Sequence, residues 1–244
     1  MNYPHPTAIV TGASSGIGWH VARQLAASGA TVVALGRDES RLQALARENR
    51  RLVPVIFDLS RTSAIDALVC ELLRQYSSIN ILINNAGVQD DLRVADASYG
   101  HEAIEREVAV NLTAPVALTR ALLPHLQSRS CASIVNVTSS LAYIPKRTSA
   151  VYGATKAGLR LFSDALRVQL RGSSVGVIEV VMPLVDTPMT AGRGSGKISA
   201  EAAAAALVAG INSGRDRVYV GKARMLPILM RWAPTLAARL MQRT

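Results

Sequence analysis

Cysteine is scarce in this chain of 244 residues, which contains only Cys70 and Cys131. Both lie in apolar segments far apart in the sequence, so we expect two buried thiols and no disulfide. Reduced thiols fit a cytoplasmic protein, and we predict that location. The sequence contains no uninterrupted apolar run of about 18 residues, as a membrane-spanning helix would need. Residues 1–7 include two prolines and no basic run, so no signal peptide is expected.

Aromatic residues make up only 4% of the chain, whereas 49% of the residues are hydrophobic. The core is therefore expected to consist of Ala, Val, Leu and Ile, which suits helices packed closely on a parallel sheet. Acidic residues are also few, and the formal net charge is +10. Such a charge fits an anionic cofactor, an acidic carrier protein or a membrane surface. No zinc-finger spacing or basic recognition helix accompanies it, so no nucleic acid partner is predicted.

Histidine is absent after His125, the last of the four histidines in the chain. The run Gly12-Ala13-Ser14-Ser15-Gly16 matches the G-x-S-x-G of a hydrolase nucleophile elbow. That mechanism needs a histidine after the catalytic acid, so we reject it. His101-Glu102 lacks the second histidine of a metalloprotease helix, and no metal site is predicted.

Strand and helix patterns alternate along the chain. Strands are expected at 8–10, 31–35, 53–57, 79–83, 133–137, 175–181 and 217–220, and helices at 20–27, 41–48, 65–76, 102–123, 151–170 and 200–209. Repeated β-α units predict an α/β fold with a doubly wound, seven-stranded parallel sheet and helices on both faces. We expect one domain over residues 1–221, with a mobile substrate loop at about 186–200, and a basic amphipathic extension at 222–244.

A glycine-rich turn follows the first apolar run. In Thr11-Gly12-Ala13-Ser14-Ser15-Gly16-Ile17-Gly18, three glycines stand between a strand pattern and a helix pattern. Glycine permits a tight bend and lets the backbone approach a ligand closely. The free N–H groups at the start of the helix then point toward a pyrophosphate. This context favours dinucleotide binding over an ordinary turn.

A tyrosine and a lysine lie four residues apart in the run Tyr152-Gly153-Ala154-Thr155-Lys156. Residues at this spacing share one face of a helix. A nearby ammonium favours the phenolate, so we expect the pKa of Tyr152 to be lowered toward neutrality. Such a tyrosine gives and takes a proton, as carbonyl and alcohol chemistry requires. By itself the spacing is also common on ordinary solvated helices.

Together these motifs resemble the short-chain dehydrogenase/reductase family, over about Thr7 to Val220. Asn84-Asn85-Ala86-Gly87 ends the fourth expected strand, like a family element, and Asn111 lies in the helix that follows. Ser139 precedes Tyr152 by 13 residues, the interval usual in the family. The resemblance implies a Rossmann-type fold and hydride transfer between a nicotinamide and a carbonyl or secondary alcohol.

The resemblance also implies a role for each residue of the catalytic set. Tyr152 is the acid and base at the substrate oxygen, and Ser139 donates a hydrogen bond to that oxygen. Lys156 lowers the pKa of the tyrosine and binds the nicotinamide ribose. Asn111 orders a water that connects the lysine to solvent. Ser140 is an alternative to Ser139, but the spacing favours Ser139.

For the cofactor, the resemblance implies contacts from Gly12, Ser14, Ser15, Gly16, Ile17, Gly18, Asp58, Leu59, Asn85, Ala86, Gly87, Tyr152, Lys156, Val185 and Thr187. An acid roughly 20 residues beyond the glycine turn would bind the 2′-hydroxyl of NAD. That place holds Gly36 and Arg37, and an arginine suits the 2′-phosphate of NADP. Asp38 would favour NAD, but it is also placed to cap the next helix. We therefore predict NADP. Met182-Pro183 replaces the usual Pro-Gly of the family.

The last part of the chain contains no acidic residue after Asp216. On a helix, Arg224, Arg231, Arg239 and Arg243 would lie on one side, and Leu226, Leu229, Ala233, Leu236 and Leu240 largely on another. Pro227 and Pro234 are expected to interrupt that helix. The pattern fits weak contact with a membrane surface, and it also fits packing on the protein or on a partner subunit.

The sequence thus predicts an NADPH-dependent oxidoreductase for a small-molecule carbonyl or alcohol, assembled as a homodimer or homotetramer. It is expected in the cytoplasm, with peripheral membrane contact as a variant of that location. The substrate pocket is expected near Gln89, 141–145 and 188–197. Two alternatives stay open: an NADP-binding regulatory or scaffold protein without turnover, and a membrane-associated acyl or lipid ketoreductase.

Overall fold

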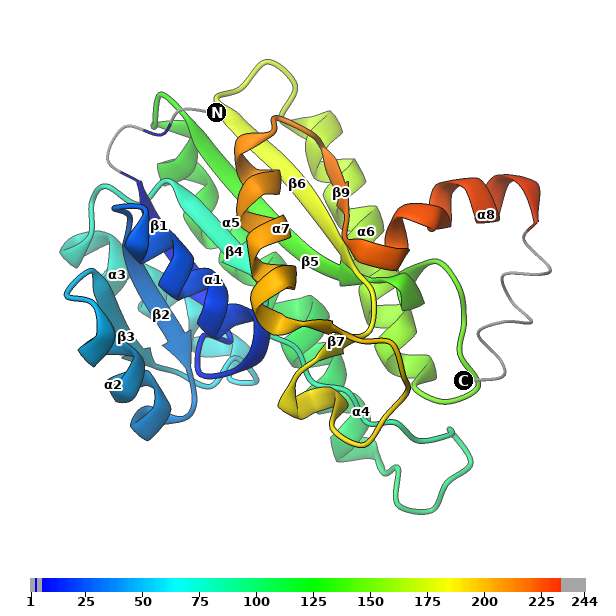
Figure 1. Ribbon diagram of the computed structural model, residues 1–244. Coiled ribbons are helices and arrows are strands. Elements are labelled where there is room, and N and C mark those ends of the chain that lie inside the picture. Colours follow the sequence, from blue (N-terminus) through cyan, green and yellow to red (C-terminus); the bar gives the residue numbers. More distant parts are fainter. Residues whose placement is uncertain (1–2, 4–5, 234–244) are drawn as a thin grey trace.

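Seven parallel strands form one sheet in the order β3-β2-β1-β4-β5-β6-β9 in the computed structural model, which describes residue 3 and residues 6–233 (Figure 1). The strands are β1 (Thr7–Thr11), β2 (Thr31–Gly36), β3 (Leu52–Ile56), β4 (Ile81–Asn84), β5 (Ala132–Ser139), β6 (Val175–Met182) and β9 (Arg217–Tyr219). A separate parallel pair is formed by β7 (Val185–Asp186) and β8 (Ile198–Ser199). The doubly wound α/β fold expected from the sequence is confirmed.

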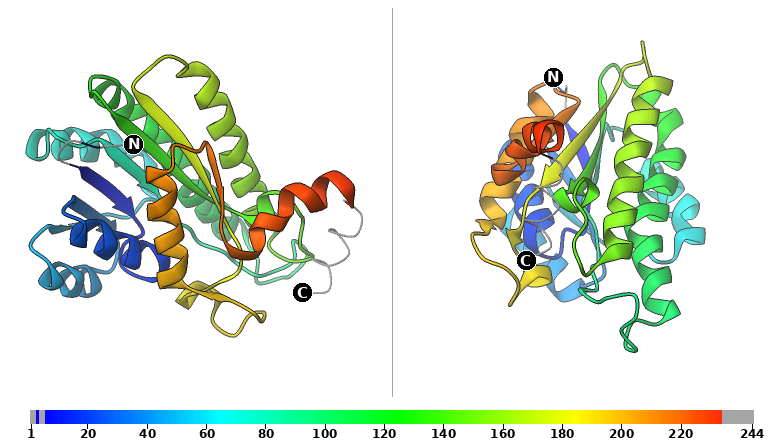
Figure 2. Two further views of the ribbon diagram at one scale, coloured as in Figure 1. Left: turned by 45° about the horizontal axis from the view of Figure 1, so that its top comes forward. Right: turned by 90° about the vertical axis from the view of Figure 1, so that its right-hand side faces the viewer.

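Helices cover both faces of this sheet. They are α1 (Gly16–Ala27), α2 (Glu39–Glu48), α3 (Ile65–Gln75), α4 (His101–Val108), α5 (Ala114–Gln127), α6 (Ala150–Gln169), α7 (Ala200–Asn212) and α8 (Leu226–Trp232). Shorter 3-10 turns occupy Thr62–Ala64, Ser140–Ala142, Pro188–Thr190 and Gly221–Met225. One face carries α1, α2 and α7, and the other carries α3, α5 and α6 (Figures 1 and 2).

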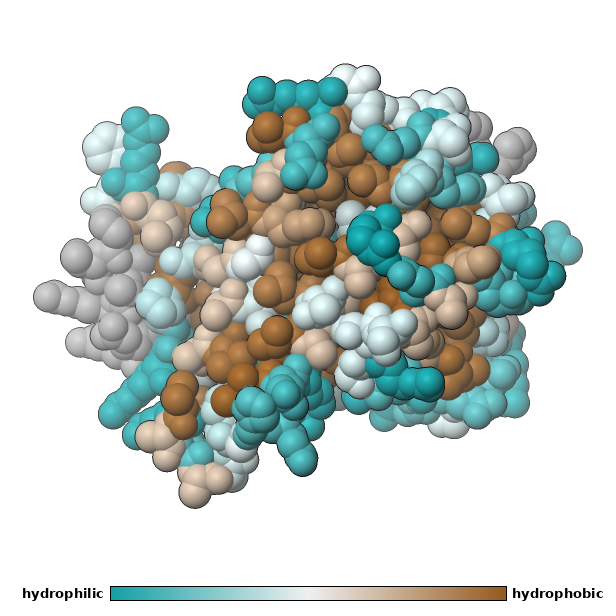
Figure 3. All heavy atoms as spheres, turned by 180° about the vertical axis from the view of Figure 1, so that it is seen from behind, coloured by the Kyte–Doolittle hydropathy of each residue, from teal (hydrophilic) through white to brown (hydrophobic). Residues whose placement is uncertain are grey.

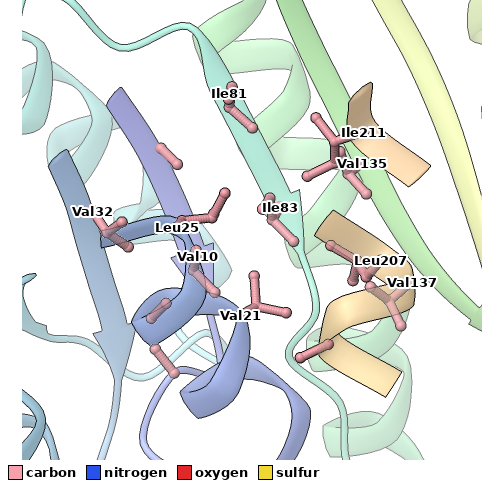
Figure 4. Packing of buried hydrophobic residues seen from close by; sticks show 14 of the residues in the cluster. Val10, Val21, Leu25, Val32, Ile81, Ile83, Val135, Val137, Leu207 and Ile211 are labelled. Atoms are coloured by element: carbon pink, nitrogen blue, oxygen red, sulfur yellow. The ribbon is translucent and has the colours of Figure 1, made fainter. Parts of the chain in front are cut away.

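Two apolar cores result, one on each side of the sheet. Because both faces are covered, the strands are almost continuously apolar, as expected for a parallel sheet. On the first side, α1 and α7 pack on the sheet through Val21, Leu25, Leu207 and Ile211 (Figure 4). On the second side, the buried residues of α3 and α5 include Ile65, Val69, Leu72, Leu118 and Leu122.

The strand order reverses beside β1. This strand pairs with β2 on one side and with β4 on the other, so the chain leaves it in two opposite directions. In such sheets the ligand binds beyond the carboxyl ends of the strands at the point of reversal. Thr11, Asn84 and Ser139 end β1, β4 and β5 and therefore lie at this edge.

Two expectations, one about a helix and one about the burial of the thiols, were wrong. Residues 102–123 do not form one continuous helix, because a π-helical turn at Ala109–Thr113 separates α4 from α5. The thiols are not both buried either: Cys70 is exposed and Cys131 is partly buried. On α3, Val69 and Leu72 face the sheet, which turns Cys70 toward solvent.

The region after β9 also differs from its expected form. Pro227 lies in the first turn of α8, where no backbone N–H is required, and therefore does not interrupt it. Leu226 is buried, and Leu229 packs on the cluster formed by Ile144, Val181 and Ala223. The expectations for Pro234, Leu236, Arg239, Leu240 and Arg243 fall outside the described residues. Within the described part, no helix is long and apolar enough to cross a membrane.

Candidate functional site

Close approach of backbones shapes the glycine-rich turn between β1 and α1. Gly12 has φ 68, and a Cβ there would lie 2.8 Å from Ala86 Cα. A Cβ on Gly18 would lie 2.3 Å from the carbonyl oxygen of Gly12. Both separations are too short for any residue but glycine. The first glycine therefore lets the turn touch the segment after β4, and the third closes the turn on itself.

Thr11 ties the turn to the end of β4. Its Oγ1 accepts hydrogen bonds from the backbone N of Asn85 and of Ala86, each at 3.0 Å, and donates to Ile83 O at 3.2 Å. Asn85 Nδ2 in turn donates to Thr11 O at 2.9 Å. Sequence reasoning gave Thr11 no role. The sequence shows only a hydroxyl at the end of a strand. Its role as a hydrogen-bond partner can be inferred only once β4 is known to lie beside β1.

A cleft of about 860 Å³, including its opening to solvent, runs along this edge of the sheet. It is lined by Gly12, Ser14, Ser15, Gly16, Ile17, Gly36, Arg37, Phe57, Asp58, Leu59, Asn85, Ala86, Gly87, Val88, Val110, Thr187, Pro188 and Met189. Most of the residues expected to contact the cofactor therefore line one cleft. Gly18, Tyr152, Lys156 and Val185 are not among its lining residues. Gly18 packs on Gly12, while Val185 is buried in the core and pairs with Ile198.

At one end of the cleft, Arg37 is exposed on the rim. The neighbouring Asp38 caps α2, since its Oδ1 accepts a hydrogen bond from Arg41 N at 3.0 Å. Burial opposes ionisation of Asp58, but hydrogen bonds from Ser60 and the charge of Arg37 outweigh it and hold the pKa of that carboxyl below its usual value. This end therefore presents an exposed cation and an ionised carboxylate to the cleft.

Beside the other end lie the side chains expected to carry the chemistry. Ser139 ends β5, and Tyr152 and Lys156 occupy successive turns of α6. Lys156 Nζ donates to Val137 O at 2.9 Å and lies 5.8 Å from the centre of the Tyr152 ring. The same Nζ is 3.6 Å from the place of a Cβ on Gly87, which lines the cleft. The ammonium thus borders both the phenol and the cleft.

The pKa values of this pair move in opposite directions. Burial raises the pKa of Tyr152 to about 12, although a hydrogen bond with Ser139 works in the other direction. Burial also lowers the pKa of Lys156 to about 8. In the protein alone the expectation of a lowered tyrosine pKa is therefore wrong. The phenol is withdrawn from water, and the ammonium donates to a backbone carbonyl rather than to the phenol. Ser139, rather than Ser140, is the serine that interacts with Tyr152.

Asn111 lies in the π-helical turn and holds the segment after β4. Its Oδ1 accepts from Val88 N at 2.9 Å, and its Nδ2 donates to Val88 O at 2.8 Å. A longer contact of 3.3 Å reaches Thr155 Oγ1, on α6 between Tyr152 and Lys156. π-Helical turns often occur at functional sites because they redirect one side chain. Here the turn directs an amide that connects the cleft wall to α6.

Glu107 is a second residue that sequence reasoning missed. It is fully buried on α4, where Oε1 accepts from Asp90 N at 2.9 Å and Oε2 accepts a short hydrogen bond from Tyr99. These bonds fix the segment between β4 and α4 against the helix. A carboxylate in a polar stretch of sequence is usually solvated, so nothing in the sequence distinguished this one.

The depressed pKa of Lys156 predicts a pH-dependent stability. Between pH 8 and its ordinary value of 10.5, the unfolded chain keeps a proton that the folded chain has lost. The free energy of unfolding should therefore rise with pH across this interval, by up to about 3 kcal/mol. Urea unfolding of the cofactor-free protein and of Lys156→Met, from neutral pH upward, measures the difference.

The difference in unfolding free energy between the two proteins should shift in favour of the wild type as pH rises. Lys222→Met, at an exposed lysine, is the control and should follow the wild type. Parallel curves for wild type and Lys156→Met would show that the ammonium is not destabilised by burial.

Comparison with known proteins agrees with this geometry. The family model described as short chain dehydrogenase matches residues 6–197. The uncharacterized oxidoreductase DltE of Bacillus subtilis is 39% identical over 190 residues, which are 77% of this chain and 74% of that protein.

Two solved structures are similar over nearly the whole chain. A short chain dehydrogenase from Burkholderia cenocepacia in complex with NADP has a TM-score of 0.87 at 30% identity and covers 99% of this chain and 100% of its own. A short-chain dehydrogenase from Sphingobium yanoikuyae in complex with NADPH has a TM-score of 0.82 at 30% identity, covering 96% and 94%.

Proposed function

Because the chain belongs to the short-chain dehydrogenase/reductase family, we propose that it is an NADPH-dependent oxidoreductase acting on a small-molecule carbonyl group or the corresponding secondary alcohol. The observation that carries the proposal is the position of Tyr152, Ser139 and Lys156 beside the cleft behind the glycine turn. The family match supports an oxidoreductase and not a regulatory or scaffold protein without turnover.

The residues of the cleft fit a dinucleotide. The turn brings backbone N–H groups at the start of α1 to the wall, where a pyrophosphate is stabilised. Gly36 carries no charge, Asp38 is engaged by α2, and Arg37 is exposed at the rim, which supports NADP over NAD. The solved relatives bound to NADP and NADPH support the same choice. Thr187 lines the cleft, whereas Val185 acts indirectly, by holding β7 in place.

NADPH, when bound, supplies the hydride for the substrate carbon. Tyr152 donates its proton to the substrate oxygen, and a pKa of about 12 keeps that proton on the phenol at neutral pH. Ser139 donates a hydrogen bond to the same oxygen. Lys156, charged below a pKa of about 8, lies beside the phenol and stabilises the phenolate that proton transfer leaves behind. Its second expected role, binding the ribose, is consistent with its position behind Gly87.

Asn111 serves as a positioning residue in this scheme. Its side chain bonds to both backbone groups of Val88 and to Thr155 Oγ1, so it connects the cleft wall to α6. The water relay expected from the family resemblance stays a prediction. We also propose that residues 1–221 form one unit, in which segment 186–200 contributes the substrate side of the cleft through Met189.

A second copy of the chain is the proposed partner, in a homodimer or homotetramer. On α6, Leu161 is 64% exposed and Val168 is 57% exposed, seven residues apart on one side of the helix. This face of the molecule carries apolar side chains at the surface among hydrophilic ones (Figure 3). Contact with another α6 would remove both from water.

We expect Tyr152→Phe to lower turnover about 10²- to 10⁴-fold, because the ring stays in place while the proton is lost. Reduction of a panel of ketones with NADPH, followed by absorbance, measures the loss, and NADPH fluorescence measures binding, which should barely change. Tyr76→Phe, remote from the cleft, is the control. A Tyr152→Phe variant with near-wild-type turnover would exclude the assigned acid.

For the cofactor, we expect Arg37→Ala to weaken NADPH binding roughly ten- to a hundredfold, since a charge-assisted hydrogen bond is worth about 1.5–3 kcal/mol. NADH lacks the 2′-phosphate, so its affinity should stay the same. Arg47→Ala, an exposed arginine on α2, provides the control. Equal weakening of both cofactors would mean that Arg37 has only a structural role.

We further propose weak contact between α8 and an anionic membrane surface. The helix extends from the body of the protein (Figure 1), and Met225, Ile228 and Trp232 are 60%, 57% and 77% exposed. Lys222 and Arg224 precede this ridge, and Arg231 stacks on the Trp232 ring. An apolar ridge flanked by cations fits a helix that lies in a membrane interface. Binding of an acidic carrier protein would require the cations but not the exposed apolar side chains.

The membrane contact is tested by sedimentation with phosphatidylserine vesicles. Replacing Lys222, Arg224 and Arg231 by Gln should weaken binding by about 1 kcal/mol for each cation at low salt. Trp232→Ser should weaken it at every salt concentration. If both variants bind as the wild type does, α8 has no role at the membrane.

A further inference from the structure

A polar cluster lies at the start of α6, one turn before Tyr152. We call it the α6 cluster, and its members are Asp91, Lys146, Thr148, Ser149 and Arg193. Asp91 Oδ1 accepts from Lys146 Nζ at 3.0 Å, from Ser149 Oγ at 2.8 Å and from Thr148 Oγ1, and Lys146 Nζ also donates to Oδ2 at 3.1 Å. Burial opposes ionisation, but these bonds hold the pKa of Asp91 at about 2. The carboxylate is thus ionised and already well satisfied.

Arg193 enters this cluster from the segment between β7 and β8. It stands between Gly192 and Gly194, whose φ angles are 72 and 59. Its backbone N donates to Thr190 O at 3.1 Å, and a Cβ on Gly194 would lie 2.5 Å from Leu184 Cδ2. The left-handed glycines and the close packing on Leu184 therefore fix the backbone on both sides of Arg193.

The guanidinium of Arg193 is poorly satisfied. Its nearest acidic atom is Asp91 Oδ2, 3.8 Å from Nη1, which is too long for a hydrogen bond. Its side chain is only 24% exposed, and within residues 6–233 no hydrogen bond from its guanidinium occurs. Five donors in a fixed fork, largely withdrawn from water, cost free energy unless a partner arrives.

The charges around Arg193 do not supply that partner. One carboxylate, Asp91, faces two cations, Lys146 and Arg193, so the three groups together carry one positive charge. Glu107 is occupied by Asp90 and Tyr99. Asp91, the carboxylate nearest to Arg193, accepts from Ser149, which immediately precedes α6 and lies three residues before Tyr152. Burial and the charge of Glu107 raise the pKa of Tyr152, and the charge of Arg193 lowers it. The α6 cluster therefore carries one excess positive charge, close to the helix turn that holds the proposed proton donor.

We propose that Arg193 binds an oxyanion of the substrate, a carboxylate or a phosphonate-like group, while the substrate carbonyl lies at Tyr152. The planar guanidinium matches the two oxygens of such a group, and the binding would satisfy donors that the protein leaves free. The enzyme then selects keto acids and hydroxy acids over neutral ketones. This inference rests on the proposed function, because it names the substrate class of the same site.

Binding without turnover tests the inference independently of catalysis. Saturation with NADP+ prevents reduction, so the affinity of a ketone is measured by calorimetry alone. The probes are acetoacetate, acetonylphosphonate and the neutral methyl acetoacetate. We expect at least one anion to bind the wild type about tenfold more tightly than the ester, and its identity separates carboxylate from phosphonate recognition.

Arg193→Gln should weaken that anion ten- to a hundredfold, as loss of a charge-assisted bond predicts, and should leave the ester unchanged. Arg193→Lys keeps the positive charge but lacks the planar guanidinium, and it should weaken binding of the anion less than Arg193→Gln does. Arg215→Gln removes the same charge at an exposed position and should bind as the wild type does. The inference is overturned if no anion binds, if anions and ester bind alike, or if Arg193→Gln changes nothing.

Turnover of the same probes with NADPH separates the two proposals. Anion binding through Arg193 without turnover of any carbonyl would contradict the proposed function and leave the oxyanion site standing. Reduction of the ester by wild type and Arg193→Gln alike, without preference for either anion, would support the oxidoreductase and remove the oxyanion site.

Discussion

The contact between the turn after β1 and the segment after β4 is the constraint on which the cleft depends. Gly12 and Ala86 approach so closely that no Cβ fits on Gly12, and Thr11 Oγ1 is shared by two backbone N–H groups and one carbonyl. Two segments 74 residues apart in sequence are thereby held together at the point where the strand order reverses. A parallel sheet has a crevice at this point, and the contact between the two segments forms the base of that crevice.

Hydrogen bonds between buried polar groups connect the cleft to α6. Asn111 connects Val88 to Thr155, and Asn136 connects Asn84 at the end of β4 to Ser163 on α6. Each bond satisfies a group that would otherwise be costly to bury. Because α6 carries Tyr152 and Lys156, the position of the Tyr152 phenol depends on side chains in the central strands as well as on its own helix.

Glu179 plays a comparable part behind Ser139. This carboxylate is fully buried in β6, where it accepts from Thr138 Oγ1 at 2.7 Å and from Tyr143 and Arg217. Thr138 immediately precedes Ser139, and Tyr143 follows the 3-10 turn that begins at Ser140. A buried ion pair contributes little net stability, but loss of one partner is expensive, so such a group enforces a specific arrangement. Here the bonds of Glu179 to Thr138 and Tyr143 fix the chain before and after Ser139.

The sequence was sufficient to predict the parallel sheet and most of its helices, because apolar runs and helical periodicity alternate along the chain. The residues that line the cleft were predicted from the glycine turn and, for most of them, from the family resemblance. It was insufficient where the answer depended on neighbours distant in sequence. The exposure of Cys70 depends on which side of α3 meets the sheet. The use of Thr11 and Glu107 depends on backbone groups contributed by other segments, and that of Asp91 depends on side chains from other segments.

The same limit explains the pKa of Tyr152, and it bears on the direction of the reaction. The spacing to Lys156 correctly indicated a shared helix face, but the burial that raises the pKa of Tyr152 is a property of the folded chain. At neutral pH the protein alone therefore holds a protonated phenol and a charged ammonium. In the proposed mechanism, carbonyl reduction consumes the proton of this phenol and the ammonium stabilises the phenolate that remains, whereas alcohol oxidation needs a phenolate as base. The environment that makes Tyr152 a poor base at neutral pH thus prepares it to act as an acid, and oxidation should be favoured only as the pH rises.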